Sequence, residues 1–201
     1  MERIRKWLSA HERSVLFSAI VTLFAVCYFG TAALPPWRPR EILTWDPVWL
    51  VPYVPVFIVP YISVFVMPLV PVVLVRDRMR FRRAVEAFAA AIVASGLVFL
   101  AVPLAPPHPP DVGTGFFAGL TGVFYALDVP TNLFPSLHVS SAFLTAFIIG
   151  RERPSWRYAM LAWAALIAVS TLFVRQHYAV DVAGGIVLAF LCRPLLARPV
   201  R

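Results

Sequence analysis

Apolar residues dominate this 201-residue chain and fall into six long runs that are separated by shorter polar connections. A transmembrane helix needs about 20 predominantly apolar residues to cross the hydrocarbon core of a bilayer. Most of the six runs reach that length or approach it; they cover residues 14–34, 47–75, 84–104, 135–149, 156–174 and 178–196. The pattern therefore predicts an all-α integral membrane protein, in which residues 1–201 form a single domain of six transmembrane helices packed as a bundle.

Two of the runs depart from a regular span. The run 47–75 contains five prolines, and a proline inside a helix removes a hydrogen bond and clashes with the preceding turn, so we expect a broken or kinked helix. The run 135–149 is short, which places its start near the membrane surface. Between the third and fourth runs, residues 113–125 carry Phe116, Phe117, Leu120 and Phe124 at helical spacing and predict a short amphipathic helix.

The composition agrees with a membrane protein: 60% of the residues are hydrophobic, 14% are charged and the mean hydropathy is +0.79. Soluble domains average roughly 45–50% apolar and about 25% charged residues. A net charge of +8 would favour a nucleic-acid partner in a soluble protein. Here the basic residues cluster at the ends of the apolar runs, so we expect no nucleic acid. Cys27 and Cys192 lie inside apolar runs and are interpreted as packing residues.

The basic residues alternate between the connections in a way that predicts the topology. All but three of the 18 lysines and arginines lie in the amino-terminal segment, in the 76–83 and 151–157 connections and in the carboxyl-terminal tail. The three exceptions are Arg38, Arg40 and Arg175. Because cytoplasmic connections carry an excess of lysine and arginine, both termini are predicted to be cytoplasmic.

That topology brings polar residues from distant parts of the sequence to one side of the membrane. His138 stands at the start of the fourth run and His177 just before the sixth, so both are predicted on the extracytoplasmic side. The third run ends on that side as well and delivers His108. Ionisable residues at the membrane edge are candidates for function, which predicts an active site at the extracytoplasmic edge of the bilayer.

The spacing within this cluster indicates phosphoryl-transfer chemistry. His177 and Asp181 are four residues apart, so on a helix the carboxylate can accept a ring N–H and leave the other nitrogen free as a nucleophile or base. Ser136 can cap the helix that starts there, and the N–H groups of such a start attract phosphate. Arg175 offers a fork of donors for phosphate oxygens. We therefore predict catalysis without a metal or a cofactor by His177, His138 and Asp181 as nucleophile, acid and orienting carboxylate, with phosphate contacts from Ser136, Arg175 and His108.

At these residues the chain resembles a known family. Pro-Ser-Leu-His at 135–138, followed by His-Tyr-Ala-Val-Asp at 177–181, is similar to the second and third signatures of the type 2 phosphatidic acid phosphatase superfamily. Six spans, and the positions of the signatures on them, also match that family, and the resemblance covers nearly the whole chain. It implies that His177 attacks phosphorus to form a phosphohistidine, that Asp181 orients His177 and that His138 protonates the leaving group.

Three departures from the lipid phosphatases of that family narrow the resemblance. Leu137 replaces the glycine of Pro-Ser-Gly-His, Ser170-Thr171 replaces a Ser-Arg pair, and residues 103–108 fill the place of a signature that supplies lysine and arginine. These substitutions, like the proline-rich second run, resemble the branch that contains inositol phosphorylceramide synthase. The likeness implies the transfer of a phospho-alcohol head group between lipids.

A charge argument favours the same substrate. A phosphate monoester is nearly a dianion and favours several fixed cations, whereas a phosphodiester carries a single negative charge, and this cluster offers one arginine. We predict a membrane lipid phosphotransferase that passes a phospho-head group from a phosphodiester lipid to a lipid or polyol alcohol. Hydrolysis of a phosphate monoester, with Arg38 or Arg40 folded over the site, is the alternative. A zinc site built from the two histidines and Asp181 is a third interpretation. The head group, acceptor, lipid tails and oligomeric state stay open.

Residues around the cluster carry further predictions. Asp46, beside a tryptophan, is expected at the membrane interface, and Asp128 in the outer loop is expected to be solvated. Gly184 and Gly185 are expected to allow close helix packing. The helix predicted within 113–125 would form a lid over the lipid entrance.

Overall fold

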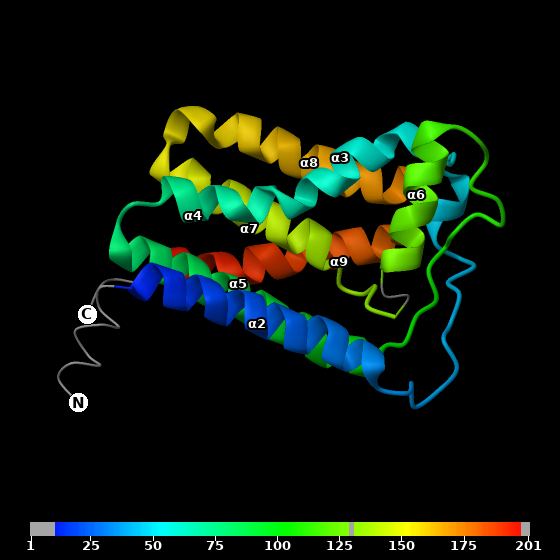
Figure 1. Cartoon of the computed structure of the whole chain (residues 1–201), viewed down its shortest axis with the longest axis horizontal. Coiled ribbons are helices and arrows are strands. Elements are labelled where there is room, and N and C mark those ends of the chain that lie inside the picture. The colour runs from blue at the N-terminus through cyan, green and yellow to red at the C-terminus, as the bar shows by residue number, and fades with distance from the viewer. Residues whose placement is uncertain (1–10, 129–130, 198–201) are drawn as a thin grey trace.

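The computed structural model describes residues 11–128 and 131–197, which form helices, most of them running alongside one another, and the loops that join them (Figure 1). The five longest are α2 (Glu12–Ala33), α5 (Arg78–Ala101), α7 (Leu137–Glu152), α8 (Arg157–Phe173) and α9 (Ala179–Cys192). No β-strand occurs within this part of the chain, where Glu41 and Leu104 form an isolated bridge. The prediction of an all-α protein is therefore confirmed for the described residues.

The second apolar run is broken, as its prolines predict. It consists of short helical pieces: η1 (Pro47–Leu50), η2 (Pro55–Phe57), α3 (Ile58–Ile62), η3 (Ser63–Phe65), η4 (Met67–Leu69) and α4 (Val70–Leu74). Pro55, Pro68 and Pro71 each occupy the first or second position of a piece, where the missing N–H has no intrahelical acceptor to lose. These three prolines therefore lie at the starts of separate helical pieces and divide the run.

Five segments of the described chain are long and apolar enough to cross a membrane. They are Glu12–Ala33, Pro55–Leu74, Arg78–Ala101, Pro154–Phe173 and Ala179–Ala197. Helix α7 has 16 residues and is shorter, in line with the short fourth run. These apolar helices suggest an integral membrane protein. The number of six spans and the side on which each end lies stay predictions.

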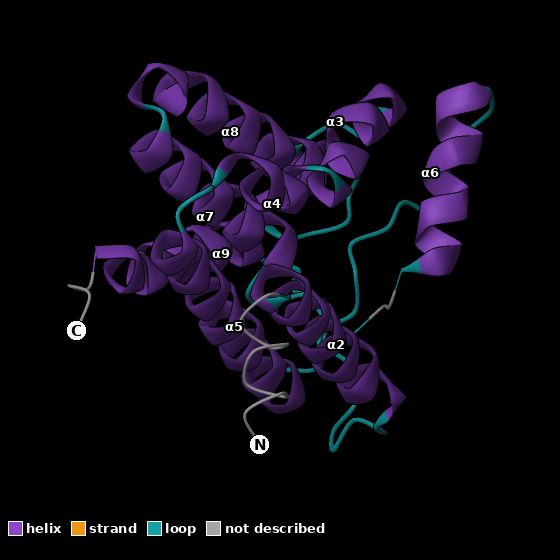
Figure 2. Cartoon of the chain, turned by 60° about the vertical axis from the view of Figure 1, so that its left-hand side comes forward, coloured by secondary structure: helices purple, strands orange, loops and turns teal. Residues whose placement is uncertain are grey.

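The two ends of the bundle differ in structure. Helix α2 begins and η6 (Arg193–Ala197) ends at one end, whereas α6 (Phe116–Leu127) and the longer loops lie at the other (Figure 1). Helix α6 stands beside the bundle and is joined to it by loops (Figure 2). It covers most of the segment in which an amphipathic helix was predicted. Helices α7 and α9 both begin at the α6 end, which brings their amino termini together there.

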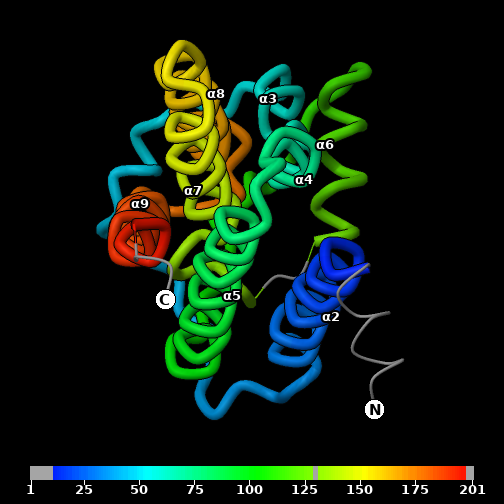
Figure 3. Tube along the Cα trace, turned by 90° about the vertical axis from the view of Figure 1, so that its left-hand side faces the viewer, coloured from blue at the N-terminus to red at the C-terminus, as the bar shows by residue number. Residues whose placement is uncertain are grey.

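Helix α2 is fastened to the broken run at the end away from α6. The guanidinium of Arg13 donates to the carbonyl oxygens of Val72 and Val75, at 2.5 and 2.6 Å, and lies 4.4 Å from the ring centroid of Phe81. Val72 lies in α4 and Val75 is the residue at its C-cap, so no further helical N–H follows to bind these carbonyls. Arg13 therefore bridges α2, α4 and α5. Figure 3 shows these three helices along the axis of the bundle.

Helices α7 and α9 approach each other closely at Gly184 and Gly185. A Cβ on Gly185 would lie 2.6 Å from the backbone oxygen of Ser136 and 2.9 Å from Cβ of Val139. A Cβ on Gly184 would lie 2.5 Å from the ring of Phe134. The two glycines allow close packing, as predicted, and they set the start of α9 directly against the start of α7.

Substitution Gly185→Ala is expected to lower the free energy of unfolding in detergent by about 1–3 kcal/mol, because the backbone of α7 blocks the new methyl group. Gly30→Ala on α2 is the matched control, since a Cβ there meets nothing within 4 Å. It should be neutral or slightly stabilising. Equal destabilisation by the two substitutions in a denaturant titration would contradict the packing argument.

Candidate active site

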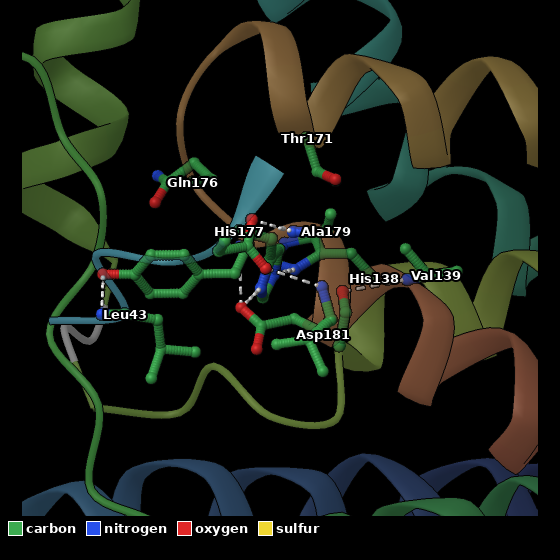
Figure 4. Close-up of polar contacts among 12 residues, drawn as sticks. Leu43, His138, Val139, Thr171, Gln176, His177, Ala179 and Asp181 are labelled. Atoms are coloured by element: carbon green, nitrogen blue, oxygen red, sulfur yellow. Dashed lines mark hydrogen bonds and ion pairs between the residues drawn. The ribbon is translucent and has the colours of Figure 1, made fainter. Parts of the chain in front are cut away.

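His177 and Asp181 lie at the start of α9 and contact each other (Figure 4). The Asp181 Oδ2 atom lies 3.3 Å from His177 Nδ1 and accepts a second hydrogen bond, at 2.9 Å, from the backbone N–H of Tyr178. Both side chains are buried. A carboxylate can only accept, so the hydrogen of a neutral His177 is held on Nδ1 and its Nε2 is left with a lone pair.

His138, in the first turn of α7, faces His177. Its Nδ1 lies 3.2 Å from His177 Nε2, and its Nε2 lies 3.1 Å from the phenol oxygen of Tyr61. Tyr61 in turn donates to Asp128 Oδ2 at 3.1 Å. Histidines that are 39 residues apart in the sequence therefore meet ring to ring, as the topology predicts. The contacts of Tyr61 and Asp128 add a second carboxylate behind His138.

The end of α8 determines where His177 sits. After α8 the chain turns through Arg175, which has a φ of 52°, in the left-handed region. The N–H of Arg175 donates to the carbonyl of Leu172, and the N–H of Gln176 donates to that of Thr171. This pair of bonds is the usual helix-ending motif in which a glycine commonly takes the left-handed position. His177 N–H also donates to Thr171, so α8 fixes the backbone of the histidine.

Arg175 has other partners than the one predicted. Its guanidinium donates to the carbonyl of Val51 at 2.6 Å and lies 5.4 Å from the ring centroid of Trp49. It therefore anchors the segment between η1 and η2 to the end of α8. A phosphate contact from Arg175 stays a prediction, and in the present geometry the side chain is held by Val51.

Ser136 caps α7, which is the local role predicted for it. Its side-chain oxygen accepts from the N–H of Val139 at 3.3 Å, and its own N–H donates to the carbonyl of Asp181 at 3.1 Å. The side chain is completely buried between the two helix starts. Ser136 thus ties α7 to α9, while a contact with phosphate stays a prediction.

Asp46 was expected at the membrane interface, but it is buried, with only 3% of its surface exposed. Its carboxylate accepts from the backbone N–H groups of Val48, Ala179 and Val180, at 2.8 to 3.0 Å. The first N–H groups of a helix have no partner inside the helix, and a carboxylate from another segment satisfies them here. The start of α9 is therefore occupied by an aspartate of the chain itself.

His108 closes the cluster from the loop before α6. Its Nε2 lies 3.0 Å from Gln176 Oε1, which can only accept, so Nε2 carries a hydrogen. The ring stacks on Tyr125 of α6, with 3.7 Å between centroids. Burial lowers the pKa of His108 below its ordinary value. The imidazole is thus suited to donate a hydrogen bond as a neutral group.

The three histidines of the cluster, His108, His138 and His177, line a small polar pocket at the α6 end of the bundle. The pocket is bordered by Tyr28, Pro106, His108, Asp128, Asn132, Leu133, His138, Gln176 and His177. Neither lysine nor arginine is among these lining residues. Asp128 was expected to be solvated, but it accepts hydrogen bonds from Tyr28 and Tyr61 and faces the pocket. Phenols that close in from α2 and α3 account for the difference.

An apolar groove of about 460 Å³ adjoins the polar pocket. Its walls come from α2, the broken run, α5, α6 and α7, and its lining is hydrophobic except for Ser140, Ser141 and the residues at one end. That end contains Tyr28, Tyr61, Asp128 and His138. His138 therefore borders both the groove and the polar pocket, whereas His177 borders the pocket alone.

The described residues were also considered as metal ligands. Within 11–128 and 131–197, no three histidine, cysteine, aspartate or glutamate residues form a group that could hold a metal ion. The zinc interpretation therefore lacks a ligand set in this part of the chain.

Comparison with known proteins finds two relatives that match part of the chain. Over 59 residues the chain is 34% identical to the inositol phosphorylceramide synthase catalytic subunit aur1 of Schizosaccharomyces pombe. The aligned segment makes up 29% of this chain and 14% of that protein. Over 68 residues it is 37% identical to an uncharacterized protein of Methanocaldococcus jannaschii, covering 34% and 28% respectively. The chain thus matches less than a third of the length of either relative, and no solved structure matches it.

A family model covers far more of the chain. The model described as PAP2 superfamily matches residues 42–195, a range that contains the broken run, α5 to α9 and every residue of the pocket except Tyr28. Members of that superfamily are phosphatases or phosphotransferases. On this match the chain belongs to the PAP2 superfamily.

Proposed function

We propose that this protein is a membrane lipid phosphotransferase, which moves a phospho-head group from a phosphodiester lipid to an alcohol through a phosphohistidine at His177. The observation that carries the proposal is the contact between His138 Nδ1 and His177 Nε2, with Asp181 on the far nitrogen of His177. A nucleophile and an acid then border one pocket, and the orienting carboxylate is buried behind the nucleophile.

The reaction proceeds in two half-steps that use the same residues. The lone pair of His177 Nε2 attacks phosphorus, the bond from phosphorus to the lipid oxygen breaks, and His138 gives its Nδ1 proton to that oxygen. A lipid alcohol leaves. His138 is now neutral and takes a proton from the acceptor alcohol, which attacks phosphorus and breaks the bond to His177. Neither half-step needs a metal ion or cofactor, and activity should survive a chelator.

The position of His138 indicates which bond breaks. His138 borders the apolar groove and the polar pocket, whereas His177 borders the pocket alone. A lipid whose hydrocarbon chain occupies the groove has its ester oxygen next to the acid and its head group next to the nucleophile. The leaving alcohol is then the lipid part, and the phospho-head group stays on His177.

The charges around the pocket favour a diester over a monoester. The described lining residues include the carboxylate of Asp128 and no lysine or arginine. Of the arginines considered, Arg175 donates to Val51 and Arg38 lies 3.8 Å from Glu41. Apart from a protonated His138, a nearly dianionic monoester would therefore meet a carboxylate and no lysine or arginine, whereas a diester brings only one negative charge.

A labelled-substrate experiment tests the proposal. Purified protein is incubated with lipid phosphodiesters and monoesters that carry a labelled phosphorus, with and without an added alcohol, and each sample is run with and without a chelator. We expect label on the alcohol only when a diester is supplied, and labelled His177 when the alcohol is omitted. Cleavage of monoesters alone would contradict head-group transfer and identify a phosphatase. Loss of turnover with the chelator would refute metal-independent catalysis.

The groove can be tested by narrowing it. Ala91 on α5 lines the groove and is almost fully buried, so Ala91→Phe should fill part of the space for a hydrocarbon chain. We expect KM for a long-chain lipid to rise about tenfold or more, with little change for a short-chain analogue. Val93→Phe, on the exposed side of the same helix, is the control and should change neither value. Similar losses for both chain lengths would argue against a lipid in the groove.

A further inference from the structure

We propose that Tyr61 and Asp128 form a second carboxylate arm, which positions His138 and determines which of its nitrogens carries the transferable proton. The inference rests on the proposed function, in which His138 is the acid. It assigns roles to two residues that lie outside the signature segments 135–138 and 177–181. Both are positioning residues, since they act through His138.

The arm is a continuous line of hydrogen bonds from the carboxylate to the imidazole. Asp128, directly after α6, accepts from the Tyr61 phenol at 3.1 Å, and the phenol oxygen lies 3.1 Å from His138 Nε2. Tyr61 is 1% exposed and its ring packs on His138 with 5.0 Å between centroids. Tyr28 of α2 donates to the other oxygen of Asp128, so two phenols hold the carboxylate.

The hydrogens in this line can be counted, because each group has a limited number. A phenol has one hydrogen, and Tyr61 gives it to Asp128. The phenol oxygen can then only accept from His138, so Nε2 of His138 carries a hydrogen. At the other end, Asp181 holds a hydrogen on His177 Nδ1. The remaining contact, between His138 Nδ1 and His177 Nε2, needs one more hydrogen.

Three hydrogens on two imidazole rings mean that the pair carries one positive charge. Burial alone disfavours a charged imidazole. Here the pair lies between the carboxylates of Asp128 and Asp181, which reduce that cost. The count also identifies the mobile proton: Nε2–H of His138 is retained by Tyr61, so the proton on Nδ1, which faces His177, is the one available to a leaving oxygen.

The first test combines substitutions with leaving groups of different quality. Tyr61→Phe removes the hydroxyl and keeps the ring. We expect kcat to fall about 10- to 100-fold for lipid phosphodiesters with an alkyl leaving alcohol, and much less for those with a nitrophenyl leaving group, which needs no acid. Asp128→Asn should show the same pattern. Equal losses with both leaving groups would overturn the inference.

A double-substitution cycle separates positioning from a general structural effect. If Tyr61 acts through His138, then Tyr61→Phe should cause no further loss in a His138→Ala background. The same loss in both backgrounds would overturn the inference. Tyr125→Phe is the matched control, because that phenol donates to the carbonyl of Val174 instead. It should leave the dependence on the leaving group as in the wild type.

A spectroscopic measurement keeps the inference testable without any substrate. In protein with isotope-labelled histidine, NMR should find His138 protonated at Nε2, and Tyr61→Phe should shift that signal. An unprotonated His138 Nε2 in the wild type would refute the arm even if phosphotransfer is observed. Conversely, the expected tautomer together with no transfer from any lipid phosphodiester would refute the proposed function and leave the arm standing.

Discussion

Replacing His177 with alanine is expected to lower transfer at least about 10⁴-fold, the scale on which removal of a nucleophile acts in enzymes with covalent intermediates. The physical reason is that no other described group of the pocket has a lone pair held toward His138 with a carboxylate behind it. The measurement is transfer of labelled head group by protein whose melting temperature is close to that of the wild type.

The labelled protein intermediate should disappear with the same substitution. His11→Ala provides the matched control, since His11 precedes α2 at the opposite end of the bundle and should retain full activity. A folded His177→Ala protein that still transfers at a rate near the wild type would rule out a covalent intermediate on this residue.

Replacing His138 with alanine is expected to have the second largest effect. General acids contribute about 10²- to 10⁴-fold, and the contribution grows as the leaving alcohol becomes a poorer leaving group. An alkyl alcohol such as a lipid needs a proton as its bond to phosphorus breaks, whereas a nitrophenol does not. We therefore expect a loss near the upper figure with lipid substrates and a far smaller loss with nitrophenyl esters.

The formation of the phosphohistidine is the informative step for His138. With a nitrophenyl ester, His138→Ala should still label His177, because the nucleophile and Asp181 are intact. The second half-step also uses His138 as a base, so the labelled protein should persist longer than in the wild type. If, with lipid substrates, labelled His177 formed and decayed in His138→Ala at the same rates as in the wild type, the role assigned to His138 would be contradicted.

The sequence was sufficient to predict site residues that contact near neighbours in the chain, or that the order of the apolar runs brings to the same end of the bundle. His177 and Asp181 are one helical turn apart, and the alternation of apolar runs is sufficient to bring His138 to the same end. Ser136 was recognisable as a cap because a cap contacts residues two or three positions away. The proline-rich run was predicted to break for a similarly local reason.

Contacts between distant segments could not be predicted in the same way. Asp46 reaches the start of α9 across more than 130 residues, and Tyr61 reaches His138 across 77. Nothing in the neighbourhood of Asp46 or Asp128 distinguishes a buried acceptor from a solvated one. Arg175 was a plausible phosphate ligand by chemistry, yet its hydrogen bond to Val51 depends on how the broken run folds.

The two attachments of α2 have a consequence for how substrates are exchanged. Arg13 joins α2 to α4 at one end of the groove, and Tyr28 joins it to Asp128 at the other, while Phe65 and Leu69 along the rim are exposed. If a lipid occupies the groove as proposed, a slot that is closed at both tips and open along its flank would take it up sideways from the surrounding leaflet. Turnover would then depend on how freely neighbouring lipids diffuse, and should slow sharply when nanodiscs of saturated lipid are cooled into the gel phase.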